Sequence, residues 1–92
     1  MTDKITVRDN VIYRNNLPIY IGSGNINLFD IRNKKDEILG YIAKTKVGLN
    51  GHKYIVITDN SLYQRESLKI AIDLIDGVLK KDYKEIMDRI IG

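Results

Sequence analysis

The chain has no cysteine, no tryptophan, one proline and one histidine among its 92 residues. The lack of cysteine excludes disulfides, thiolate metal sites and a cysteine nucleophile. No apolar run approaches the roughly 20 residues that a membrane-spanning helix needs. The first ten residues also lack the apolar core of a signal peptide. We therefore expect a soluble protein of the cytoplasm.

The residues that are present predict one small globular domain over 1–92. Hydrophobic residues make up 43% and charged residues 29% of the chain, which is close to the globular average and argues against disorder. Sixteen isoleucines supply a core, although a chain of this size buries only roughly 60–65% of its unfolded surface. The abundance of isoleucine, lysine and asparagine fits an AT-rich genome, either bacterial or phage.

The charge is spread unevenly along the chain. The net charge is +3; residues 1–58 carry nine Lys/Arg against five Asp/Glu (+4), and residues 59–92 carry six against seven (−1). The positive residues of the first part are concentrated at Arg32, Lys34, Lys35, Lys44, Lys46 and Lys53. Such a field attracts phosphate backbones. The alternative is a solvated surface that keeps strand edges from aggregating.

The first 22 residues predict two tight hairpins with turns at Asp9-Asn10 and Asn15-Asn16, since these residue types tolerate positive φ. The register that follows places Arg8 opposite Val11, Val7 opposite Ile12, Arg14 opposite Leu17, and Ile12 opposite Ile19. One face then carries Ile5, Val7, Ile12, Leu17, Ile19 and Ile21, and the other carries Thr6, Arg8, Val11, Tyr13, Pro18 and Tyr20. This division is typical of an antiparallel sheet that is buried on one side.

Three further strands are predicted at 26–31, 37–46 and 53–58, after a break at Gly22-Ser23-Gly24. Asn50-Gly51 is a strong hairpin dipeptide. A two-residue turn there would pair Lys46 with Ile55 and so set charge against apolar side chains. We therefore expect a longer loop or a bulge between Lys46 and His52, with Lys44, Lys46, His52 and Lys53 on a projecting basic finger.

The last third of the chain predicts helices. Ser61 and Gln64 match a capping box, and the apolar arc of the helix that follows is roughly 200° wide. Asp82 and Glu85 form a second capping box, which begins a short helix with one apolar face. The predicted fold class is α+β, an antiparallel meander sheet of five or six strands (1–58) followed by two C-terminal helices (59–92) packed on one face.

The wide apolar arc also raises the question of self-association. A helix needs an apolar stripe of roughly 100° to cover one sheet. The excess must be covered by the short last helix or by a second copy of the chain. We expect a homodimer with Ile70, Leu74 and Val78 at its interface, because soluble monomers avoid contiguous exposed apolar patches.

Motifs for catalysis, cofactors and metals are weak or missing, so we expect a protein that is not an enzyme and has no cofactor. His52 falls at a predicted loop tip without a partner nucleophile. Asp30, Asp36 and Glu37 are more typical of turn formers and edge charges than of a metal site. Gly22-Ser23-Gly24 lacks the residues that complete a phosphate-binding loop.

The remaining prediction is a binding surface, with nucleic acid as the preferred partner. Arg32, Lys34, Lys35, Lys44, Lys46 and Lys53 would hold phosphates, while Tyr13 and Tyr20, with Arg8 beside them, would stack on bases. Tyrosine is also a good strand former, so the same residues fit an ordinary sheet surface. The competing class is a protein–protein regulator, for example a phage-type inhibitor that docks on a larger host enzyme or complex.

The order of elements over residues 26–79, including the strand KYIVIT and the segment SLYQRESLKIAIDLI, is similar to single-stranded-DNA-binding coactivator domains. A three-stranded sheet with a helix also resembles the arm-binding domains of phage-type integrases. Both resemblances lie in element order, with no residue motif, and transfer no functional residue.

Overall fold

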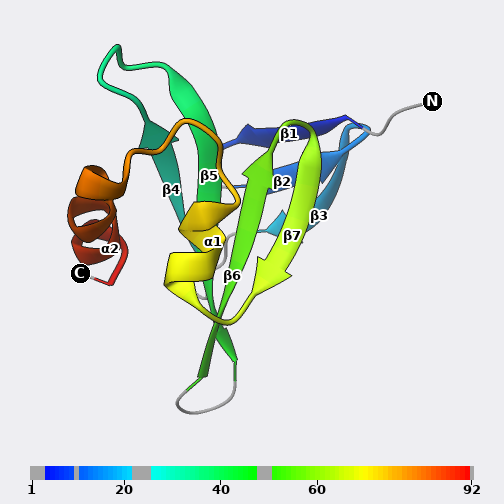
Figure 1. Cartoon of the computed structure of the whole chain (residues 1–92). Helices are drawn as coiled ribbons and strands as arrows, with labels where there is room; N and C mark the ends of the chain where they lie inside the picture. Colours follow the sequence, from blue (N-terminus) through cyan, green and yellow to red (C-terminus); the bar gives the residue numbers. More distant parts are fainter. Residues whose placement is uncertain (1–3, 10, 22–25, 48–50, 92) are drawn as a thin grey trace.

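Two antiparallel sheets are stacked on each other, and helices cover the outer face of the larger sheet (Figure 1). The computed structural model describes residues 4–9, 11–21, 26–47 and 51–91. Its strands are β1 (Ile5–Arg8), β2 (Val11–Arg14), β3 (Leu17–Ile21), β4 (Ile26–Arg32), β5 (Ile38–Val47), β6 (Gly51–Thr58) and β7 (Ser61–Arg65). Its helices are α1 (Leu68–Asp73), a 3₁₀ turn η1 (Lys80–Asp82) and α2 (Tyr83–Ile91). The α+β class and the two C-terminal helices are confirmed, whereas the strands form two sheets and not one meander of five or six.

The smaller sheet has the order β1-β2-β3. Asp9, Asn15 and Asn16 have φ values of 49°, 52° and 68°, as hairpin turns of the primed types require. Three predicted pairs are confirmed, namely Arg8 with Val11, Val7 with Ile12 and Arg14 with Leu17.

The predicted pairing of Ile12 with Ile19 is wrong. The register shifts between Ile12 and Tyr13, so Tyr13 pairs with Pro18 and Ile12 pairs with Tyr20. One extra residue in a strand is a β-bulge, which changes the alternation of faces beyond it. The predicted aliphatic face is buried at Ile5 and Ile12, while Leu17 and Ile19 are 69% and 37% exposed. The predicted faces of Tyr20 and Ile21 concern side chains outside the described part.

The larger sheet has the order β4-β5-β6-β7. Lys46 pairs with His52 and Val47 with Gly51, so the register that would set Lys46 against Ile55 does not occur. The loop that joins β5 to β6, and with it Asn50, lies outside the described residues, as does the predicted break at 22–24.

The predicted start of the first helix is wrong, because Ser61–Arg65 is strand β7. Asp59 and Asn60 both have positive φ and form a tight turn, after which Ser61 pairs with Thr58. Residues 59–65 therefore belong to the sheet. The helix is capped instead by Ser67, whose Oγ accepts a hydrogen bond from the N–H of Ile70 at 3.4 Å.

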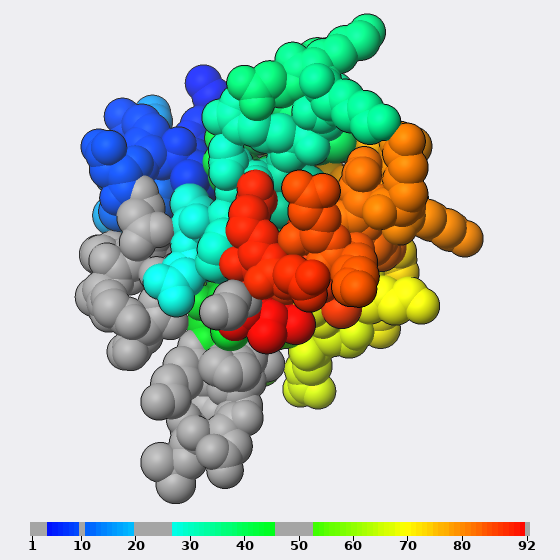
Figure 2. All heavy atoms as spheres, turned by 90° about the vertical axis from the view of Figure 1, so that its left-hand side faces the viewer, coloured from blue at the N-terminus to red at the C-terminus, as the bar shows by residue number. Residues whose placement is uncertain are grey.

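Both faces of the larger sheet are buried, since successive side chains of a strand point to opposite faces. On one face Ile42 and Val56 form a helix-side core with Ile72 and other residues of α1 and α2. On the other, Ala43 and Ile55 pack with Ile12 of the smaller sheet. The helices thus occupy one face, as predicted, and Figure 2 shows α2 lying beside β4.

Candidate nucleic-acid interface

The β5–β6 hairpin extends beyond the helices and the smaller sheet, at the bottom of Figure 1. At its base Lys44 pairs with Tyr54, which pairs in turn with Arg65 of β7. Tyr54 belongs to the helix-side core, so Lys44 and Arg65 lie on the helix side of the sheet. Thr45 pairs with Lys53, which places Lys53 on the opposite side. The hairpin therefore presents basic residues on both faces.

The hairpin is free of acidic residues. The sequence from Ile38 to Thr58 contains three lysines and a histidine but no Asp or Glu. Within the described part of the chain, neither Lys44 nor Lys53 forms an ion pair. The positive charge of these two side chains is thus available to a ligand.

Arg65 is a basic residue of this region that the sequence prediction did not select. Its guanidinium carbon lies 5.6 Å from the centre of the Tyr63 ring, and its Nη1 donates to the Gln64 carbonyl at 2.7 Å. The helix predicted to follow Ser61 would include Arg65, which instead ends strand β7. The signal that could have placed it correctly is Asp59-Asn60, which repeats the predicted turn dipeptide Asp9-Asn10.

A shallow hollow adjoins the base of the hairpin beside the start of α1. Its lining includes Lys53, Arg65, Glu66 and Ile70. Glu66 brings a carboxylate to this side of the hairpin base. The side chains of Lys46 and His52, which the sequence places further out along the hairpin, are outside the described part of the structure.

The predicted Arg8 and Tyr13 lie apart from the hairpin, on the outer face of the smaller sheet. The guanidinium carbon of Arg8 is 4.5 Å from the centre of the Tyr13 ring. This cation–π contact covers the ring face that a base would need for stacking. The position of the Tyr20 side chain is not described, so its predicted role is untested.

Arg32, Lys34 and Lys35 lie at the β4–β5 turn, at the end of the sheet opposite the hairpin (Figure 1). Arg32 pairs with Ile38, which lies six residues before Lys44 in β5, so at about 3.3 Å per residue the two groups are about 20 Å apart. Arg32 Nε lies 2.6 Å from Asp30 Oδ2, and Arg32 Nη1 lies 3.5 Å from Asp36 Oδ1. The hydrogen bond from Arg32 lowers the pKa of Asp30, and Asp30 raises the pKa of Arg32. Arg32 is thus already paired with carboxylates.

The three residues predicted for a dimer interface differ in their surroundings. Leu74 and Val78 pack against the helix-side core of the same chain, whereas Ile70 is 50% exposed. The homodimer stays a prediction, which sedimentation velocity at increasing protein concentration tests.

Among the described residues, no three His, Cys, Asp or Glu side chains are grouped so that they could hold a metal ion. No helix in that part is long and apolar enough to cross a membrane. Comparisons with protein-family models, curated proteins and solved structures find no match, so neither resemblance in element order gains support.

Proposed function

We propose that this protein is a small, non-catalytic module that binds double-stranded DNA with its β5–β6 hairpin. The observation on which the proposal rests is a projecting two-stranded ribbon with lysines on both faces and no acid between Ile38 and Thr58. The major groove of B-DNA, about 12 Å wide, admits a two-stranded β-ribbon.

In this arrangement strands β5 and β6 approach the groove and the base of the hairpin faces the phosphates. Lys44 and Arg65 would contact one phosphate strand, and Lys53, on the opposite face, would contact the other. Phosphate contacts of this kind supply affinity and position the ribbon without reading sequence. Double-stranded DNA is favoured over a stacked single strand because Arg8 already covers the Tyr13 ring.

Two charge-reversal variants of equal net charge test the proposal. Lys44→Glu with Lys53→Glu changes the hairpin, and Lys34→Glu with Lys35→Glu changes the exposed β4–β5 turn as a matched control. We expect the hairpin variant to bind duplex DNA at least tenfold more weakly than the control at the same salt concentration, since each lost phosphate contact also loses its counterion release. Fluorescence anisotropy with a labelled duplex measures the affinity of both variants.

Equal losses in the two variants would mean that only net charge matters and would contradict the hairpin interface. Tighter binding to single-stranded than to duplex DNA would contradict the groove arrangement. Circular dichroism of both variants checks that the fold is intact before binding is compared.

A further inference from the structure

β1 is an edge strand, because the smaller sheet has the order β1-β2-β3. The N–H of Asn15 donates to the carbonyl of Lys4 at 2.8 Å. Hydrogen-bonded and non-bonded pairs alternate along an antiparallel ladder. The backbone groups of Thr6 and Arg8 therefore form hydrogen bonds with β2, while the backbone N–H and C=O groups of Ile5 and Val7 point to the open edge.

The two outward-facing residues differ in their partners. The N–H of Ile5 donates to the side-chain oxygen of Asn60 at 3.4 Å, which closes that end of the edge. No described residue bonds the outward N–H and C=O of Val7. Val7 thus offers one donor and one acceptor in the geometry of a missing neighbouring strand.

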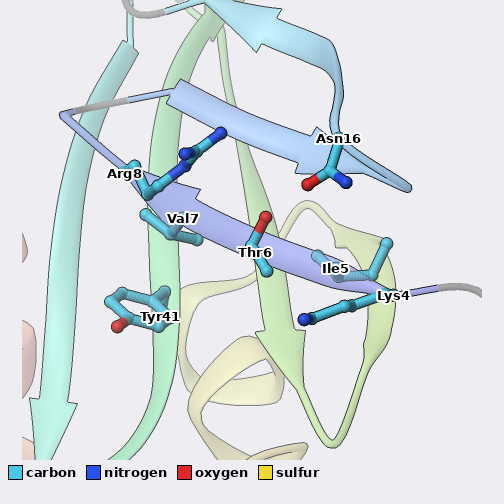
Figure 3. Close-up of a pocket in the computed structure, with 7 residues that line it drawn as sticks. All are labelled: Lys4, Ile5, Thr6, Val7, Arg8, Asn16 and Tyr41. Atoms are coloured by element: carbon cyan, nitrogen blue, oxygen red, sulfur yellow. The ribbon is translucent and has the colours of Figure 1, made fainter.

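An open hollow follows this edge (Figure 3). Its lining comes mainly from residues 4–8, including Lys4 and Arg8, together with Asn16 and with Tyr41 of β5. The lining contains two cations and no acidic residue. Val7 and Tyr41 also line a second hollow, whose lining combines the apolar Leu28 and Ile38 with Asp9, Asp30 and Arg32. The edge of β1 is therefore flanked by a cation at each end, Lys4 and Arg8, and bordered towards the larger sheet by apolar side chains and the Asp30–Arg32 ion pair.

We propose that the edge of β1 binds an extended acidic segment of a protein partner by β-strand addition. The residue opposite Val7 would exchange both backbone hydrogen bonds with it, and its side chain would lie inward over Tyr41 and Leu28. The residues on either side would lie on the outer face, beside Thr6 and Arg8. The pattern that fits is an apolar residue between two acidic ones. This second site is separate from the proposed DNA interface.

Short capped peptides provide the probe. One peptide alternates Glu and Val, and its counterpart alternates Lys and Val. With isotope-labelled wild-type protein, we expect the Glu/Val peptide to slow hydrogen exchange of the Val7 amide, while the Thr6 amide, already bonded to β2, is unaffected. The Lys/Val peptide should bind at least tenfold more weakly, because Lys4 and Arg8 repel it.

Variants at Val7 separate the backbone from the side chain. Val7→Pro removes the outward N–H without removing a bond to β2, and edge strands tolerate proline. Val7→Ala keeps the N–H and removes most of the side chain. We expect affinity for the Glu/Val peptide to fall about tenfold more in Val7→Pro than in Val7→Ala, as expected for loss of one backbone hydrogen bond.

The proposal would be overturned if the Glu/Val peptide did not bind, or if both peptides bound equally well. It would also be overturned if the peptide slowed hydrogen exchange at another strand edge and not at Val7. The exchange experiment uses the unaltered chain, so the proposal remains testable even if Val7→Pro fails to fold.

Discussion

The hydroxyl of Tyr83, the first residue of α2, donates a hydrogen bond of 2.5 Å to Oδ1 of Asp73, the last residue of α1. The bond joins the two helices that cover the larger sheet. It raises the pKa of Tyr83 to about 12, and burial of the phenol acts in the same direction. The contact therefore makes the stability of the helical layer depend on pH.

The first prediction concerns this dependence. The folded chain keeps the Tyr83 proton to higher pH than the unfolded chain, whose tyrosines titrate near 10. The stabilisation is thus complete below about pH 10 and is lost as the pH rises towards 12. Tyr83→Phe should lower the free energy of unfolding by about 0.5–1.5 kcal/mol at neutral pH. Urea denaturation at several pH values measures the free energy of unfolding of the wild type and the variant. If the variant lost stability between pH 10 and 12 as steeply as the wild type, the role of Tyr83 would be contradicted.

The second prediction concerns Gly40, near the start of β5. A Cβ at this position would lie 2.8 Å from the carbonyl oxygen of Ile57 and 3.3 Å from Cδ1 of Ile75. Backbone cannot move aside as a flexible side chain can. Gly40→Ala should therefore destabilise the fold by about 1–3 kcal/mol. An unchanged thermal midpoint would show that β5 and β6 can separate without cost.

The third prediction compares neighbouring isoleucines in the last turn of α2. Ile90 is 2% exposed within the helix-side core, whereas Ile91 is 59% exposed. Ile90→Ala should cost about 2–5 kcal/mol, as large-to-small changes in a core do. Ile91→Ala should cost no more than about 0.5 kcal/mol. Chemical denaturation of the two variants tests whether α2 packs on the larger sheet through Ile90. Equal losses of stability in the two variants would contradict this packing.

The hairpins of the smaller sheet could be predicted because Asp and Asn at Asp9, Asn15 and Asn16 tolerate the positive φ that the turns need. The bulge at Ile12 and Tyr13 could not, since it depends on how β3 fits the twist of β2. Strand β7 was missed for a different reason. Ser61 and Gln64 satisfy a helix cap as well as a strand, and only the preceding turn distinguishes the two.

The candidate site was predictable in composition but not in arrangement. The sequence shows which residues are basic, but the register decides that Lys44 and Lys53 lie on opposite faces. The pairing of Arg32 with Asp30 was within reach, because residues two apart in a strand share a face. The distance between the β4–β5 turn and the hairpin depends on where β5 begins and on its register, and strand boundaries can be predicted only approximately from sequence.

The salt dependence of duplex DNA binding tests the central claim most directly. The measurement is fluorescence anisotropy with a labelled duplex about two helical turns long, at a series of salt concentrations. Each phosphate contact contributes about −0.9 to the slope of log K against log salt. Replacing Lys44 and Lys53 with Gln should therefore make the slope shallower by about 1.8, while replacing Lys34 and Lys35 should leave it unchanged. No binding at low salt, or the same slope in the wild type and the hairpin variant, would contradict DNA binding by the β5–β6 hairpin.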